Sequence, residues 1–145
     1  MRIAIGGDHA GFGLKQAIID HLGRCGHTVD DRGTMSEDSV DYPDFARLVA
    51  QEVSAGGADL GIVVCGSGNG VNITANKTPG VRSALAWRPD VAALARQHNN
   101  ANVLALPARF ITPQEGQAIV EAFLAASFEG GRHQRRVEKI ETKGA

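Results

Sequence analysis

The chain has 145 residues and an almost balanced charge, with 15 Lys and Arg against 16 Asp and Glu. This length is typical of one domain with a single hydrophobic core. The balanced charge provides no basic surface field that would attract nucleic acid or an anionic membrane. No apolar run approaches the roughly 18 residues of a membrane span. Neither nucleic acid nor a membrane is therefore an expected partner.

Short apolar runs alternate with longer segments of helical period, which is the pattern of parallel strands joined by crossover helices in an α/β fold. The strand candidates are residues 3–5, 28–29, 60–64, 83–86 and 102–106. Helices are expected over residues 14–22, 45–53, 72–77 and 89–97, with Pro43 and Pro89 in first turns. Between the second strand and the second helix, the polar residues 33–41 are expected to form a loop at the ligand end of the sheet.

The last third of the chain predicts two more helices. Thr112 and Pro113 have the residue types of an N-cap and a first helical position, and an apolar side follows from Ala118 to Ala126. Gly130 and Gly131 then end this segment before a polar terminal helix from about Arg132.

Polar, glycine-rich segments follow three of the predicted strands. They are residues 6–11 after the first, residues 65–70 after the third and residues 107–109 after the fifth. Ligands bind outside the carboxyl ends of strands in open parallel sheets. We therefore expect these three segments to converge at one edge of the sheet.

Cys65 and the glycine loop from Gly66 to Gly70 are the strongest candidates for chemistry. Alternate glycines leave several N–H groups free to turn toward one oxygen, although a plain tight turn would use the same residues. A thiol that faces a helix start can be stabilised as a thiolate and act as a base. Cys25, in contrast, is expected to be an inert or surface residue.

Other polar residues have both a functional and a structural interpretation. Asp8 and His9 could supply acid, base or hydrogen-bonding groups, or a structural partner for a carbonyl. His98 could be a helix C-cap. Arg132 and Arg136, spaced i,i+4, share a helical face that could grip one phosphate or simply be solvated.

Three competing motifs fail on particular residues. A dinucleotide-binding turn at residues 6–11 would place Asp8 where a pyrophosphate must approach, and its carboxylate would repel that group. The second glycine loop lacks the G-K-[ST] element of a nucleotide-binding P-loop. His21, Cys25 and His27 have no established zinc spacing.

Six short motifs, taken together and in order, closely resemble the type B ribose-5-phosphate isomerases of the ribose/galactose/allose sugar-phosphate isomerase family. They are Gly-Asp-His-Ala-Gly at 7–11, Asp-Tyr-Pro at 41–43, Cys-Gly-Ser-Gly-Asn-Gly at 65–70, Ala-Asn-Lys at 75–77, Arg-Gln-His-Asn at 96–99 and Gly-Gly-Arg-His-Gln-Arg-Arg at 130–136. The resemblance implies one doubly wound, Rossmann-like three-layer domain over residues 1–145, with a five-stranded parallel sheet and a C-terminal helix.

The resemblance also implies residue roles in an aldose–ketose isomerisation of the pentose phosphate pathway, without metal or cofactor. Cys65 would move a proton between C1 and C2, and His98 would donate a proton during ring opening. Val71 stands where another branch of the family has a glutamate base, so the cysteine branch is the match. The remaining residues would bind substrate or enediolate: Asp8, His9, Gly66, Ser67, Gly68, Asn69, Gly70, Asn99, Arg109, Arg132 and Arg136.

Several alternatives remain open at the level of sequence. Family members act on ribose, allose, galactose or tetrose phosphates, and a noncatalytic sugar-phosphate-binding module would keep the glycine loop but not need Cys65 or His98. The resemblance implies a homodimer, often paired into a tetramer, with sites shared between subunits. Two cysteines without C-x-x-C spacing, and an N-terminus that runs directly into a strand, favour a cytoplasmic location.

Overall fold

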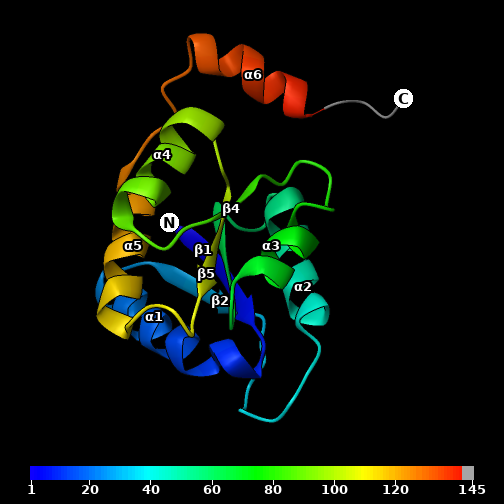
Figure 1. Cartoon of the computed structure of the whole chain (residues 1–145), viewed down its shortest axis with the longest axis vertical. Coiled ribbons are helices and arrows are strands. Elements are labelled where there is room, and N and C mark those ends of the chain that lie inside the picture. Colours follow the sequence, from blue (N-terminus) through cyan, green and yellow to red (C-terminus); the bar gives the residue numbers. More distant parts are fainter. Residues whose placement is uncertain (142–145) are drawn as a thin grey trace.

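A five-stranded parallel sheet forms the centre of the computed structural model, which describes residues 1–141 (Figure 1). Its order is β2-β1-β3-β5-β4, and every neighbouring pair is parallel. All the predicted strands are present, with these bounds: β1 (Arg2–Gly7), β2 (Thr28–Asp31), β3 (Leu60–Cys65), β4 (Ser83–Leu85) and β5 (Val103–Pro107). The predicted α/β fold with a parallel sheet is therefore confirmed.

Helices cover both faces of the sheet. On one face lie α1 (Phe12–Arg24), α4 (Pro89–Asn99) and α5 (Pro113–Ala125), and on the other lie α2 (Tyr42–Ser54) and α3 (Asn69–Ala75) (Figure 1). The terminal helix α6 (Arg132–Ile140) lies beyond the amino ends of the strands, beside the end of α4. No helix among residues 1–141 combines the length and apolar character needed to cross a membrane.

The central strand β3 explains why two separate hydrophobic cores form. All six of its residues are buried, and their side chains alternate between the two faces. Ile62 and Val64 pack with the α1, α4 and α5 side, whereas Val63 and Cys65 pack with the α2 and α3 side. The alternation therefore places the Cys65 side chain on the face that α3 covers.

Several helix boundaries differ from the predicted ones, most notably the start of α3 and the end of α5. The helix after the glycine loop begins at Asn69 and not at Asn72, because Gly68 makes the turn with a φ of 77° and Asn69 and Gly70 already belong to the first helical turn. The prediction that Ala126 continues the apolar side of α5 is wrong, since this residue has extended backbone. The chain there turns toward α4, where the Glu129 N–H donates to the Gln97 carbonyl at 3.0 Å.

The capping signals and the polar loop behave as predicted. The Thr112 side chain accepts from the Glu115 N–H, and the Glu115 side chain accepts from the Thr112 N–H, which makes a capping box at the start of α5. Residues 33–41 form neither helix nor strand, and the Thr34 N–H ties this loop to the Gly7 carbonyl at 2.8 Å. The loop is thereby held at the carboxyl end of β1.

Candidate active site

The three polar segments after β1, β3 and β5 meet at one edge of the sheet, as predicted. The Asp8 N–H donates to the Val64 carbonyl at 3.2 Å, and the Arg109 N–H donates to the Gly66 carbonyl at 3.0 Å. The chain winds outward in opposite directions from β1 and β3, so this edge contains a topological switch point, where parallel sheets place their ligands. We call this region, formed by residues 8–9, 65–70 and 107–109, the carboxyl rim.

Cys65 is the last residue of β3 and is 5% exposed. The glycine loop that follows it turns into α3, and the Ser67 Oγ accepts from the Asn69 N–H at 3.2 Å. Among residues 1–141, we find no hydrogen bond donated by the backbone N–H of either Ser67 or Gly68. The loop can therefore offer N–H donors to an oxyanion close to the thiol, as the sequence predicts.

Two side chains cover the glycine loop so closely that larger residues would not fit beneath them. A Cβ placed on Gly66 would lie 3.0 Å from an Arg109 guanidinium nitrogen, and one placed on Gly70 would lie 2.5 Å from Cζ of Tyr42. The glycines therefore provide room as well as free N–H groups. Tyr42 belongs to one of the six motifs, but we did not predict it as a site residue.

Asp8 and His9 lie at the carboxyl rim with restricted side chains. The Asp8 carboxylate is buried and accepts from the Gly11 N–H at 3.1 Å. Nδ1 of His9 accepts from the Val40 N–H at 3.2 Å, so the neutral imidazole carries its proton on Nε2 and can donate it. Both residues line a hollow of about 540 Å³ that extends to Tyr42 and Arg47.

His98, Asn99, Arg132 and Arg136 form a second group at the opposite end of the sheet. His98 and Asn99 end α4 just before β5 begins, whereas Cys65 pairs with Pro107, the last residue of β5. The strand itself spans roughly 13 Å at ~3.3 Å per residue. Figure 1 shows α6, which carries both arginines, at this same amino end. Within one chain, the structure therefore does not bring these residues to Cys65.

The second group contains a histidine pair that sequence reasoning missed. The rings of His98 and His133 are stacked, with centroids 4.2 Å apart and an angle of 12° between the planes. Oε1 of Glu129 lies 3.6 Å from Nε2 of His98 and 3.7 Å from Nε2 of His133. Burial lowers the pKa of His133 most, and the charges of His98 and Arg132 lower that pKa further. No sequence signal links positions 98 and 133, because only the tertiary fold brings them together.

The ligand atoms of His98, Glu129 and His133 lie within 4.8 Å of one another, the only such group found among residues 1–141. A metal ion must lie near the plane of each imidazole that binds it, along the nitrogen lone pair. In this pair the planes are almost parallel and stacked, so the two lone pairs do not converge as tetrahedral zinc would require. This geometry fits an ion-paired cluster better than a metal site.

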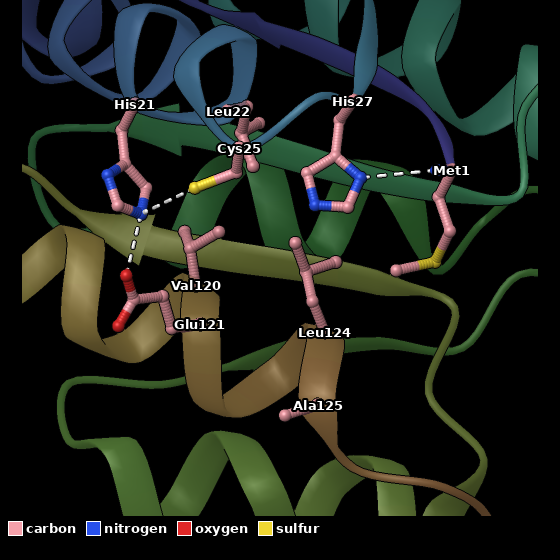
Figure 2. A pocket seen from close by; sticks show the side chains of 9 residues that line it. All are labelled: Met1, His21, Leu22, Cys25, His27, Val120, Glu121, Leu124 and Ala125. Carbon is pink, nitrogen blue, oxygen red and sulfur yellow. Dashed lines mark hydrogen bonds and ion pairs between the residues drawn. The ribbon is translucent and has the colours of Figure 1, made fainter.

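Cys25 lies in a separate pocket of about 360 Å³ near the amino end of β1, between α1 and α5 (Figure 2). Nε2 of His21 lies 3.8 Å from the Cys25 sulfur and 2.9 Å from Oε1 of Glu121. Nδ1 of His27 faces the N-terminal amine at 3.2 Å. His21 and Cys25 thus contact each other, whereas His27 contacts the N-terminus, so the three residues of the rejected zinc motif do not converge on one point. Cys25 is exposed and distant from the carboxyl rim.

Comparison with known proteins identifies the family. Residues 3–140 match a family model described as Ribose/Galactose Isomerase. The chain belongs to the ribose/galactose isomerase family. It is 48% identical to ribose-5-phosphate isomerase B of Escherichia coli, over 96% of this chain and 93% of that protein.

Solved structures of similar proteins agree with the family assignment. A ribose 5-phosphate isomerase from Thermotoga maritima has a TM-score of 0.95 at 50% identity, covering 97% of both chains. Ribose-5-phosphate isomerase B from Mycoplasma genitalium, solved with bound ribulose-5-phosphate, has a TM-score of 0.93 at 51% identity, covering 97% of this chain and 93% of that one. The resemblance inferred from the motifs, and the doubly wound fold that it implies, are therefore confirmed.

Proposed function

We propose that this protein interconverts ribose 5-phosphate and ribulose 5-phosphate, with Cys65 as the base. The observation that carries the proposal is the position of Cys65, at the end of a buried central strand and directly before a loop with free N–H donors. The proposed substrate is inferred from relatives that are 48–52% identical to this chain. These relatives are named ribose-5-phosphate isomerase B or probable ribose-5-phosphate isomerase B.

The reaction has two stages, opening of the sugar ring and isomerisation of the open chain, and each stage moves protons. First, the ring opens to the aldehyde form: His98 donates a proton to the ring oxygen, the bond between that oxygen and C1 breaks, and the hydroxyl on C1 releases its proton to solvent water. The Cys65 thiolate then removes the proton from C2, and the electron pair moves toward the carbonyl oxygen on C1 to give an enediolate. Return of the proton to C1, with transfer of the hydroxyl proton from O2 to O1, gives the ketose. Positioned acid–base groups of this kind contribute about 10²–10⁴-fold in rate.

The glycine loop supplies the electrostatic part of the mechanism. Negative charge develops on the enediolate oxygens as C2 loses its proton, and the N–H groups of residues 66–70 lie beside the thiol that removes it. Asp8 and His9 border the same space and can hold the sugar hydroxyls in place. These donors need no reorganisation during the reaction, because the backbone of β3 and α3 already fixes them.

A complete site requires two copies of the chain. The base and the loop lie at the carboxyl rim, whereas His98 and α6 lie at the amino end, so a partner's amino end has to meet this rim. We propose a homodimer, with a tetramer as a possible higher assembly. Trp87 and Phe110 support association at the rim, since these large apolar side chains are 53% and 74% exposed beside the glycine loop.

Arg132 and Arg136 are proposed to bind the phosphate across the subunit boundary. Both side chains are exposed on α6, and their i,i+4 spacing places them on one face. Arg109, which covers Gly66 at the rim, and Asn99, which is next to His98, are proposed to bind the substrate as well. Guanidinium groups suit this task because they bind phosphate oxygens in pairs of parallel hydrogen bonds.

A cytoplasmic location is part of the proposal. Both cysteines are free thiols, and a cysteine base must remain reduced to work. The proton transfers described above use side chains and backbone N–H groups alone, and the proposal includes no metal or cofactor.

The test compares the two cysteines on a panel of pentose, hexose and tetrose phosphates. Cys65→Ser should reduce kcat on ribose 5-phosphate by about 10²–10⁴-fold, because a hydroxyl is too weakly acidic to replace the thiolate. Cys25→Ser is the matched control and should keep the wild-type rate. A folded Cys65→Ser protein with wild-type kcat would refute the cysteine base, and faster turnover of another sugar phosphate would change the assigned substrate.

A further inference from the structure

Beyond the residues assigned so far, His133 occupies a position that the proposed mechanism does not use. Its side chain is 10% exposed, whereas that of its stacking partner His98 is 38% exposed. The buried ring therefore lies behind the accessible one. Most of the His133 ring is therefore closed to a substrate that approaches His98 from solvent.

We propose that His133 is a positioning residue for His98: its ring fixes the plane of the His98 imidazole and leaves the single proton of the pair on His98. This inference rests on the proposed isomerase function. It adds a residue that acts through the proton donor and not on the sugar.

The geometry restricts the pair to one positive charge. Two imidazolium rings 4.2 Å apart would repel each other, and within residues 1–141 the one carboxylate that pairs with both rings is that of Glu129. Arg132 and Arg136 on α6 add further positive charge around His133. One of the two stacked rings can therefore become positively charged readily, whereas charging the second ring as well costs free energy because the two charges repel.

Burial decides which ring holds that proton. It is the largest cause of the lowered pKa of His133, and the neighbouring positive charges act in the same direction, while Glu129 acts in the opposite one. The more exposed His98 ring keeps water on one side and faces the neutral His133 ring on the other. A protonated ring is stabilised by an aromatic face, which a second cation could not provide.

The backbone keeps the pair aligned. The Glu129 N–H donates to the Gln97 carbonyl at 3.0 Å, so the carboxylate is attached beside His98. The His133 N–H donates to the Gly130 carbonyl at 3.0 Å, which fixes the first turn of α6. Tilting of the His98 ring would therefore break the stack and separate Nε2 from Glu129.

The first test is independent of catalysis. Ring-nitrogen NMR of the unliganded protein should show His98 taking up its proton at a higher pH than His133. The opposite order, or simultaneous protonation, would overturn the proposal. This measurement remains informative even if the protein fails to isomerise ribose 5-phosphate, so failure of the proposed function and failure of this inference are distinguishable.

The second test separates positioning from a merely structural role. In the assembled enzyme, His133→Ala should lower kcat by about 10-fold and change KM by less than about twofold, because the proton donor loses its orientation. His133→Phe keeps an aromatic face and should restore most of that loss. The control is His27→Ala, a histidine outside the site, which should behave as wild type.

An effect on binding alone would point to a different role. If His133→Ala raised KM and left kcat unchanged, the residue would only hold α6 and its phosphate-binding arginines, and the positioning role would be wrong. An unchanged kcat in the folded Ala variant would also refute it.

Discussion

Mixing two inactive variants should restore a defined fraction of the isomerase activity. Cys65→Ser removes the base at the carboxyl rim, and His98→Ala removes the proton donor at the amino end. Each change leaves the other end of the sheet untouched, because β5 separates the two positions by at least its own length. Neither homodimer should then contain an intact site.

The expected magnitude follows from the arrangement of the two ends. Random exchange of equal amounts gives about half mixed dimers, and a twofold-symmetric dimer has two equivalent sites. In a mixed dimer, one site combines the wild-type residue from each chain and the other combines both substitutions. About a quarter of all sites are therefore intact, far above variants reduced by about 10²–10⁴-fold.

The assay mixes the variants under conditions of subunit exchange and measures kcat per chain, with exchange confirmed by native mass spectrometry of differently tagged chains. Mixing wild type with Cys65→Ser is the control, and about half of its sites should be active whichever subunit supplies His98. Verified exchange without recovery in the main experiment would refute the composite site.

Three further predictions concern binding and stability. Arg132→Ala and Arg136→Ala should each raise KM by roughly 10- to 150-fold, which corresponds to about 1.5–3 kcal/mol. Arg135→Ala, on the same helix, is the control and should leave KM unchanged. Equal KM values for all three variants would refute the proposed phosphate site. Lys15→Met should lower the free energy of unfolding by about 3 kcal/mol in urea titrations, because the Asp31 carboxylate, which lies 2.7 Å from the Lys15 amine, loses its counter-charge. An unchanged midpoint of the urea titration would contradict this prediction. Finally, burial lowers the pKa of His133, so the unfolded chain takes up a proton more readily than the folded chain. The free energy of unfolding should therefore fall as the pH decreases from about 6.5, and His133→Phe should lessen this fall. Identical pH profiles for the wild type and His133→Phe would refute the lowered pKa of His133.

Local sequence patterns predict most of the fold. The apolar run at residues 60–64 identifies the buried central strand, and Thr112 with Pro113 identifies the start of α5, because both signals arise from neighbouring residues. The order of the strands and the end of α5 depend on contacts between distant segments. The turn at Ala126, for example, leads to a hydrogen bond with Gln97 that no local pattern encodes.

Some residues of the candidate site likewise have a local sequence signal, whereas others depend on contacts between distant segments. Residues 65–70 carry a local signal, since a cysteine before alternating glycines at a strand end indicates an activated thiol. Lys15 also had a signal that we did not use: it lies beside Leu14 and Ile18 on the buried face of α1, and it is completely buried against Asp31. His133 had none, because its role depends on the tertiary contact with His98.

The separation of Cys65 and His98 makes assembly a condition of activity. If the composite site is correct, a newly made chain can fold, bury its cores and still be unable to turn over substrate until it meets a second copy. Activity per chain then depends on protein concentration near the dissociation constant of the dimer and falls on dilution. The activity per chain is then a measure of dimer formation. A substitution that only weakens the subunit contact would lower this activity, just as a substitution in the active site would.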